Sequence, residues 1–317
     1  MKSIASAPGK IILFGEHFVI YGIKAVLCST DKKITATSQF VDERIVRIRS
    51  SIGESEMKID SLDNLENVQQ KFMKPFFHIA KKTLMENSIE QGIEIVIESE
   101  IPPGVGLGSS SAACVAVTAS VNGLFHKLSK EEVVKLSLQA ERTIFEQNSG
   151  ADSSVSTFGG LVSYDLKDGF QRIPSRNDLS FIISNSAQVH NTQDVVKQVR
   201  KFKEKNKDLF NKLCREEIDI VDNAIISLKE NDLNKLGSLM LRNHELLKQI
   251  GVSTEKIDVL IKEARKTSYG AKITGAGGGG CIIALVDNSN AKDTLNNLGK
   301  ISDCFITKID YNGLQYA

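Results

Sequence analysis

Three glycine-rich segments, widely separated along the chain, constrain its fold more than any other feature. They read "SAPGKIILFGEHFVIYG" (residues 6–22), "IPPGVGLGSSSAA" (residues 101–113) and "AKITGAGGGGCIIAL" (residues 271–285). Glycine has no Cβ, so it accepts positive φ and lets another group come close to the backbone. Between these segments, strand-like and helix-like stretches alternate. The sequence therefore predicts a mixed structure in which glycine turns interrupt the strands and helices.

The second segment predicts a strand, a loop and then a helix. Ile93, Ile95 and Ile97 precede it with the period of two that is typical of a strand. After Gly108, the small residues of "SSSAACVAVTASVNGLF" indicate a helix that begins near Ser109 to Ser111 with a serine as its N-cap. The free N–H groups at such a terminus attract anions. The segment is therefore a candidate phosphate site, the alternative being a loop that merely turns a strand into a helix.

Other phosphate-binding motifs do not fit this segment. No lysine follows its glycines, so the pattern G-x-x-x-x-G-K-[ST] is absent, and no window gives G-x-G-x-x-G. The chain also lacks the VAIK, HRD and DFG motifs of protein kinases. The charge of a bound phosphate could instead be met by Mg²⁺ and by side chains from elsewhere. Walker, Rossmann and protein kinase folds are thus disfavoured, whereas phosphate binding is not.

The length of 317 residues favours two domains over a single core. Turn residues near positions 175–179 follow the strand-like "GGLVSYDL", and we place the domain boundary there. Residues 200–265 are charged and carry apolar residues every three or four positions. This spacing predicts helices that cover a core.

Charge and cysteine content exclude several classes of function. Lys and Arg number 40 against 39 Asp and Glu, so the chain offers no basic field to nucleic acid or to a membrane surface. The five cysteines are scattered without metal-ligand spacing and are interpreted as buried thiols in a reducing compartment. No apolar run reaches the ~20 residues of a membrane span, and the N-terminus lacks the apolar core of a signal peptide. We expect a cytoplasmic protein.

The three segments, in this order, resemble the three motifs of the GHMP kinases, a family that comprises galactokinase, homoserine kinase, mevalonate kinase and phosphomevalonate kinase. The resemblance spans residues 6–285, and "GEHFVIYG" is most similar to the mevalonate kinase branch, as are residues 140–160 and 243–253. It implies an α+β fold with the active site between two domains. The N-terminal domain (residues 1–175) would resemble domain 2 of ribosomal protein S5, and the C-terminal domain (residues 176–317) would be ferredoxin-like.

In the mevalonate kinase branch, the resemblance implies ATP and Mg²⁺ as the ligands and mevalonate as the acceptor. The γ-phosphoryl group of ATP would pass to the primary hydroxyl of mevalonate, a step of isoprenoid biosynthesis. The alternatives are phosphomevalonate, another mevalonate hydroxyl or a sugar as acceptor, or a relative that binds ligands without turnover. Intact Lys10, Glu141 and Asp152 argue against a silent relative. The oligomeric state stays open, with a homodimer among the alternatives.

The same resemblance assigns the residues of the reaction. Asp152 in "NSGADSS" matches the catalytic base, and Lys10 in "PGK" matches a lysine that keeps this carboxylate ionised and favours an alkoxide. Taken alone, Asp152 reads as a turn or cap residue in a polar loop, and Lys10 as a lysine at a strand end. Glu16 and His17 resemble residues near the mevalonate site, whereas Tyr21 is expected to pack.

The resemblance also assigns the nucleotide and the metal. The ATP phosphates would lie on Gly104, Gly106, Gly108 and the serines Ser109, Ser110 and Ser111. Ser110 and Glu141 match the Mg²⁺ ligands, with Ser109 as an alternative within the run of three serines. Magnesium takes one or two hard oxygen ligands from a protein and the rest from phosphates and water. Without the resemblance, Glu141 would read as an exposed residue of a helix.

Departures from the branch pattern bear on the acceptor. The run "FEQNSGAD" has Phe145, Glu146 and Asn148 where relatives carry His, Gly and Pro. Gln193 replaces a residue that is often basic, and Thr254 replaces a histidine. These changes leave the expected phosphoryl transfer intact and concern acceptor identity alone. The four other histidines show no metal spacing and are read as structural or surface residues; they are His78, His126, His190 and His244.

Overall fold

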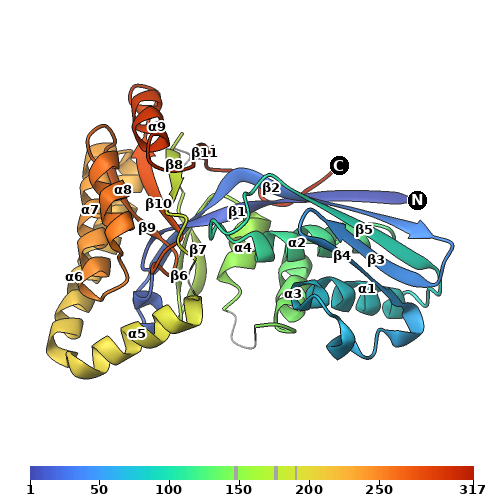
Figure 1. The fold of residues 1–317 in the computed structure, drawn as a ribbon. Helices are drawn as coiled ribbons and strands as arrows, with labels where there is room; N and C mark the ends of the chain where they lie inside the picture. Colours follow the sequence, from blue (N-terminus) through green and yellow to red (C-terminus); the bar gives the residue numbers. More distant parts are fainter. Residues whose placement is uncertain (146–148, 175–177, 190) are drawn as a thin grey trace.

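The computed structural model describes residues 1–145, 149–174, 178–189 and 191–317. Two β-sheets, each covered by its own helices, form two lobes (Figure 1). The expected domain boundary at residues 175–176, together with Glu146, Asn148 and His190, lies outside the described residues. The mixed helix and sheet content confirms the predicted α+β class.

The first sheet belongs to the N-terminal lobe. Its main path runs β12-β1-β2-β5-β3-β4, with β6 paired to β2 and β7 paired to β6. All pairs are antiparallel except β3 with β5. The strands are β1 (Lys2–Phe14), β2 (Ala25–Val41), β3 (Ile45–Ser50), β4 (Gly53–Lys58), β5 (Gly92–Ser99), β6 (Leu161–Asp165), β7 (Gly169–Arg172) and β12 (Gln315–Tyr316).

The predicted period of two is confirmed in β5, where Ile93, Ile95 and Ile97 are buried. Four helices pack beneath this sheet: α1 (Lys74–Glu86), α2 (Ser109–Asn122), α3 (Lys130–Glu141) and α4 (Ala151–Phe158). Helix α2 is central, and its small residues are buried from Ser111 to Asn122. Short 3-10 helices complete the lobe: η1 (Phe18–Tyr21), η2 (Ile59–Ser61), η3 (Leu65–Asn67) and η4 (Lys71–Met73).

The second sheet has the antiparallel order β11-β8-β10-β9, which is that of a ferredoxin-like fold. Its strands are β8 (Ser180–Asn185), β9 (Gly270–Thr274), β10 (Cys281–Val286) and β11 (Cys304–Lys308). The helices are α5 (Thr192–Lys205), α6 (Lys207–Glu230), α7 (Leu233–Gln249), α8 (Glu255–Ala264) and α9 (Ala291–Gly299). The predicted helical character of residues 200–265 is thereby confirmed.

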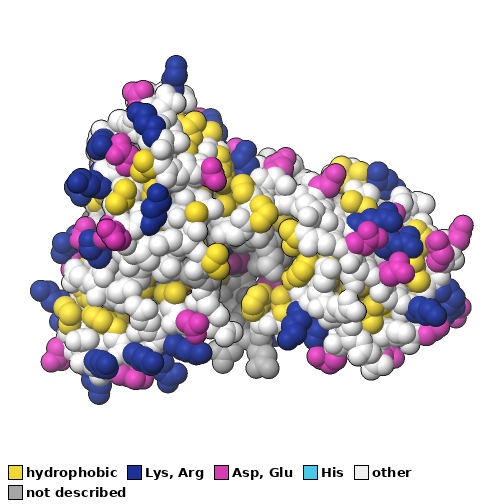
Figure 2. Space-filling model, viewed as in Figure 1, with side chains coloured by type: hydrophobic (Ala, Val, Ile, Leu, Met, Phe, Trp, Pro, Cys, Tyr) yellow, Lys and Arg dark blue, Asp and Glu magenta, His cyan; other side chains and the backbone are white. Residues whose placement is uncertain are grey.

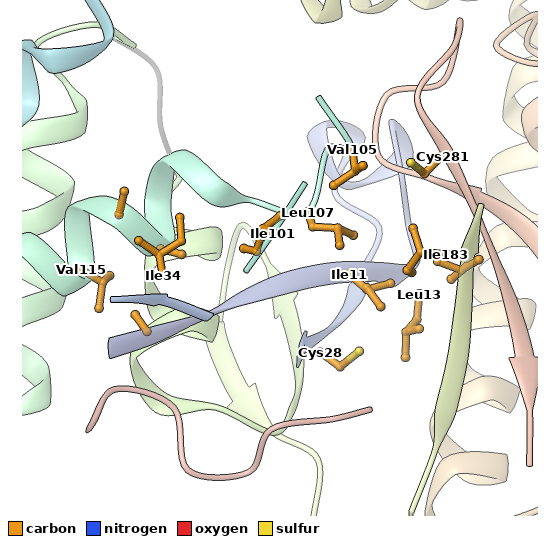
Figure 3. Close-up of a cluster of buried hydrophobic side chains, with 14 of the residues drawn as sticks. Ile11, Leu13, Cys28, Ile34, Ile101, Val105, Leu107, Val115, Ile183 and Cys281 are labelled. Atoms are coloured by element: carbon orange, nitrogen blue, oxygen red, sulfur yellow. The ribbon is translucent and has the colours of Figure 1, made fainter. Parts of the chain in front are cut away.

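One hydrophobic core runs through both lobes. It joins Ile11 and Leu13 of β1 to Ile183 of β8 and Cys281 of β10, and it also takes in Val105 (Figure 3). Because apolar side chains fill the junction, the two lobes are packed against each other beside the glycine segments.

The structure also tests the expectations about the cysteines and about membrane spans. Cys28, Cys114 and Cys281 are buried free thiols, but Cys214 and Cys304 are only half-buried, so burial was wrongly expected for these two. Cys304 lies on β11, an edge strand of the second sheet, and Cys214 lies on α6 next to the buried stripe of that helix. Among the described residues, no helix is both long and apolar enough to cross a lipid bilayer.

Candidate active site

A cavity of about 400 Å³ lies where the two lobes meet. Figure 2 shows the hollow between them. All three glycine-rich segments reach its wall, together with α4 and the start of α5. Predicted site residues that line it are Lys10, Glu16, His17, Gly106 and Asp152.

The loop before α2 alternates between buried side chains and open backbone. Val105 and Leu107 are 3% and 1% exposed and point into the core (Figure 3). Gly104 and Gly106 have φ of 76° and 71°, and a Cβ placed on either would meet nothing within 4 Å. The apolar residues thus anchor the loop, while its glycine backbone faces open space in which a ligand fits.

Helix α2 begins at Ser109, as predicted, but the predicted serine N-cap is wrong. The N-cap is Gly108, at φ 69°, and it contributes no capping side chain. The reason is local packing, because a Cβ on Gly108 would lie 2.7 Å from Cγ of Lys10. Without a side-chain cap, the first N–H groups of α2 are available to an anion.

Lys10 connects this loop to Asp152. Its backbone N–H donates to the carbonyl of Leu107 at 2.8 Å, and its Nζ lies 3.3 Å from Oδ2 of Asp152. Asp152 occupies the first turn of α4 after the left-handed N-cap Gly150, so the expected loop position is wrong. The Asp152 side chain is 34% exposed, whereas that of Lys10 is 8% exposed. A carboxylate that a substrate can reach therefore sits beside a nearly buried cation.

The predicted metal residues lie on two helices, the serines in the first turn of α2 and Glu141 at the end of α3. Ser109 and Ser110 are exposed in its first turn, and Ser111 is buried. Glu141, the last residue of α3, is 1% exposed, so the reading of an exposed helix residue is excluded. Burial, and secondarily the negative charge of Glu141, raises the pKa of the Cys114 thiol. Cys114 follows Ser110 by four residues, so the charge of Glu141 acts on the first half of α2.

A serine hydroxyl and a carboxylate are hard oxygen donors of the kind that Mg²⁺ prefers. Across the described residues, no group of three His, Cys, Asp or Glu is arranged to hold a metal. A site with two protein oxygens fits an ion whose other ligands come from phosphates and water. Ser110 and Glu141 therefore fit a magnesium ion that accompanies a nucleotide.

The first glycine segment brings Glu16 and His17 to the wall of the same cavity. His17 has φ of 60°, rare for a residue with a side chain, and its Nε2 lies 2.7 Å from the carbonyl oxygen of Ala276. Burial lowers the pKa of His17. The Glu16 carboxylate is buried and accepts a hydrogen bond from Nζ of Lys272 on β9. The segment is thus tied to the third glycine segment by both side chains.

Sequence reasoning missed Lys272, Glu217 and Asn243, which lie next to this segment. Oε1 of Glu217 accepts the N–H of Gly15 at 2.9 Å and the Nδ2 of Asn243 at 2.8 Å. Two patterns could have found Lys272 and Glu217. Lys272 is the one charged residue in the apolar strand β9, and Glu217 takes a core position between Leu213 and Ile220 of α6.

The other predicted residues lie at or beyond the rim. Tyr21 packs edge-on against Phe210, as expected. Gln193 is exposed in the first turn of α5, and Thr254 caps α8 through its hydroxyl. Phe145 is 50% exposed. Of the described histidines read as structural or surface residues, His244 is buried, His78 is half-buried and His126 is exposed.

Comparison with known proteins places this geometry in a family. The model of the GHMP kinases N terminal domain matches residues 73–160, and that of the GHMP kinases C terminal domain matches residues 224–301. Mevalonate kinase of Pyrococcus horikoshii is 37% identical, covering 89% of this chain and 88% of its own length. That of Pyrococcus furiosus is 34% identical, with 91% and 90% covered. The solved mevalonate kinase of Methanococcus jannaschii has a TM-score of 0.87 at 30% identity, with 97% and 98% covered.

Proposed function

Because the chain belongs to the GHMP kinase family, and within it to the mevalonate kinases, we infer that it phosphorylates the primary hydroxyl of mevalonate with ATP. The product is 5-phosphomevalonate, an intermediate of isoprenoid biosynthesis. The observation that carries this proposal is the Lys10–Asp152 pair, which lies in the cavity beside the uncapped start of α2. A base and a phosphate site at one cavity are what phosphoryl transfer to an alcohol requires.

We assign the proton transfer to Asp152. The mevalonate oxygen forms a bond to the γ-phosphorus while the bond from that phosphorus to the leaving oxygen of ADP breaks. The hydroxyl proton passes to the carboxylate of Asp152, which is 34% exposed and can be reached. The Lys10 ammonium, 3.3 Å away, stabilises negative charge that develops on the attacking oxygen.

We assign the ATP phosphates to Gly104, Gly106, Gly108 and the serines 109–111. The positive φ values of the three glycines and the open space beside Gly104 and Gly106 support this assignment. Ser110 and Glu141 would hold Mg²⁺, with Ser109 as the alternative serine. When bound, the ion neutralises phosphate charge.

We place the acceptor against Gly15, Glu16 and His17, which line the cavity. Apolar residues line the same cavity, including Ile12, Leu27 and Val196, and suit the methyl and methylene groups of mevalonate. Residues 1–175 and 176–317 remain the proposed domains, except that β12 at the end of the chain pairs with β1 and joins the sheet of the first lobe. Free thiols in the described chain agree with the proposed cytoplasmic location.

An assay of ADP release tests the function. The purified protein would be given ATP, Mg²⁺ and, in turn, mevalonate, phosphomevalonate, homoserine or galactose. We expect turnover with mevalonate far above that with the others. If the protein preferred another acceptor, its assignment to the GHMP kinases would stand, but mevalonate would be rejected as its substrate. ATP binding without turnover on any acceptor would point to a silent relative.

A further inference from the structure

A buried polar cluster lies behind Gly15 to His17, on the side of the second lobe. It consists of Glu16, Glu217 of α6, Asn243 of α7 and Lys272 of β9. Glu217, Asn243 and Lys272 are 0% exposed, and Glu16 is 2% exposed. Burying so many polar groups is costly unless each has a partner, so the cluster calls for a role.

Glu217 holds the backbone of the first glycine segment. Its Oε1 accepts the Gly15 N–H at 2.9 Å, and its two oxygens lie 2.8 and 2.7 Å from Nδ2 of Asn243. Gly15 has φ of 91°, and a Cβ there would lie 2.5 Å from Cα of Ala25. Gly15 is therefore fixed between β2 on one side and Glu217 on the other.

The cluster contains two carboxyl groups and one ammonium group, of which Lys272 and Glu16 form an ion pair and Glu217 lies within electrostatic range of both. Lys272 donates to Glu16 and also, at 2.6 Å, to the carbonyl of Ile273. The titratable groups that face Glu217 are Glu16, Lys272 and Cys214, with His244 beside it on α7. The charge of Lys10 favours the ionised form of Glu16, but Lys10 forms its ion pair with Asp152. Two buried negative charges beside one positive charge are unfavourable, and a proton on one carboxyl removes the excess.

Asn243 can share that proton. Among the described residues, its Oδ1 has no hydrogen-bond partner, while its Nδ2 faces both oxygens of Glu217. The two ends of an amide are exchanged by a rotation that ordinary coordinates do not distinguish. After this rotation Oε2 of a protonated Glu217 donates to the amide oxygen over the contact of 2.7 Å, while Oε1 gives up the amide donor and keeps the Gly15 N–H.

We propose that Glu217 and Asn243 share a proton and act as positioning residues, which hold Gly15, and with it Glu16 and His17, at the acceptor wall. Burial, with the neighbouring Glu16 adding to it, raises the pKa of Glu217 to about 8. This inference rests on the proposed acceptor site. Above this pKa, Glu217 ionises beside Glu16, so the cluster should loosen and acceptor binding should weaken as the pH becomes alkaline.

Two substitutions of Glu217 separate positioning from charge. Glu217→Leu removes the acceptor of the Gly15 N–H, and we expect KM for mevalonate to rise roughly ten- to a hundredfold while KM for ATP changes little. Glu217→Gln keeps that acceptor and can donate to the amide oxygen of Asn243. It should restore the mevalonate KM at neutral pH and abolish its rise at alkaline pH.

Glu216→Gln is the matched control. Glu216 precedes Glu217 on α6 and pairs with Arg242, the residue before Asn243 on α7, but both are on the outer side. This control should keep the KM values and the pH profile of the unaltered protein. Thermal melts show whether Glu217→Leu is folded, and if it is not, the pH profile of Glu217→Gln decides by itself.

Two results would overturn the proposal. If Glu217→Gln were as impaired as Glu217→Leu, Glu217 would have to act as an anion. If the mevalonate KM of Glu217→Gln still rose at alkaline pH, the titrating proton would belong to another group. A folded Glu217→Leu with an unchanged mevalonate KM would deny positioning. Absence of mevalonate turnover in the unaltered protein is a different failure, that of the proposed substrate. The same variants would then be compared on whichever acceptor it does phosphorylate.

Discussion

Two lysine–carboxylate pairs lie at the cleft, one in its wall and one behind it, and they differ in solvent access. Lys10 and Asp152 both belong to the first lobe, and Asp152 is 34% exposed to the cavity. Lys272 and Glu16 join the second sheet to the first glycine segment, and their side chains are 0% and 1% exposed. The same two chemical groups thus occur once open to a substrate and once sealed between the lobes.

The difference in solvent access indicates that one pair serves the reaction and the other the folded structure. A carboxylate that takes a proton from a substrate has to be accessible to that substrate. Of the carboxylates in these two pairs, Asp152 is accessible and Glu16 is not. A sealed ion pair is costly to break, since the remaining charge stays buried. The open pair should therefore control turnover and the sealed pair should control folding. Substitutions can test this division.

The largest effect is expected for Asp152→Asn. The amide keeps the size of the side chain but cannot accept the hydroxyl proton, so kcat should fall roughly 10²- to 10⁴-fold. Steady-state kinetics measures kcat, and nucleotide titration measures the affinity for ATP, which should be nearly unchanged. A fall at the low end would indicate that positioning outweighs proton abstraction. Full activity would remove Asp152 from the mechanism.

Lys272→Met should show the opposite pattern. It leaves the carboxylate of Glu16 buried without its cation, so the free energy of unfolding should fall by about 3–5 kcal/mol. Urea titration followed by circular dichroism measures the loss. Lys10→Met is the matched control, since its aliphatic stem still packs on Gly108 and its partner can be hydrated. Equal losses in the two variants would erase the distinction between the pairs.

The sequence predicted the open pair and not the sealed one, for a physical reason. Lys10 and Asp152 lie in short motifs that resemble those of the mevalonate kinases, and this resemblance assigned their roles. Lys272 and Glu217 are joined to Glu16 and Gly15 by long-range contacts, so local patterns say only that polar residues occupy apolar positions. Strand β5 and helix α2 were predictable because their periodicity and small residues act locally.

Errors of local geometry also arose from tertiary contacts. A serine cap was expected before α2, but the chain passes Lys10 too closely for a side chain, which selects Gly108. Asp152 was expected in a loop, yet Gly150 adopts the left-handed conformation and starts α4 one residue before it. In both cases glycine, rather than a polar cap, begins a helix at the active site.

Gly106→Val tests whether the open backbone beside the reactive pair holds ATP. Valine at φ 71° fills space that is otherwise free, so ATP affinity should fall at least about tenfold. Ser110→Ala leaves every backbone donor in place and should mainly slow the reaction. Nucleotide titration of both variants compares them.

Gly169→Val provides the control for backbone strain. Gly169, in the first sheet, has φ of 68° and also has nothing within 4 Å of an added Cβ, but it does not line the cavity. It should lose comparable stability in a thermal melt and keep its ATP affinity. Normal ATP binding by a folded Gly106→Val would place the phosphates elsewhere.

Glu141 is the carboxylate that could contradict the contrast between the accessible Asp152 and the buried Glu16. It is as buried as Glu16, which suggests a structural role, yet it is the residue to which the resemblance assigns Mg²⁺. If the metal role holds, Glu141→Gln should raise the Mg²⁺ concentration for half-maximal rate at least about tenfold, because an amide oxygen lacks the charge that holds the cation. Magnesium titrations of the rate at saturating ATP measure this. An unchanged titration with a large loss of stability would instead group Glu141 with Glu16, and burial alone would then distinguish structural from reactive carboxylates in this cleft.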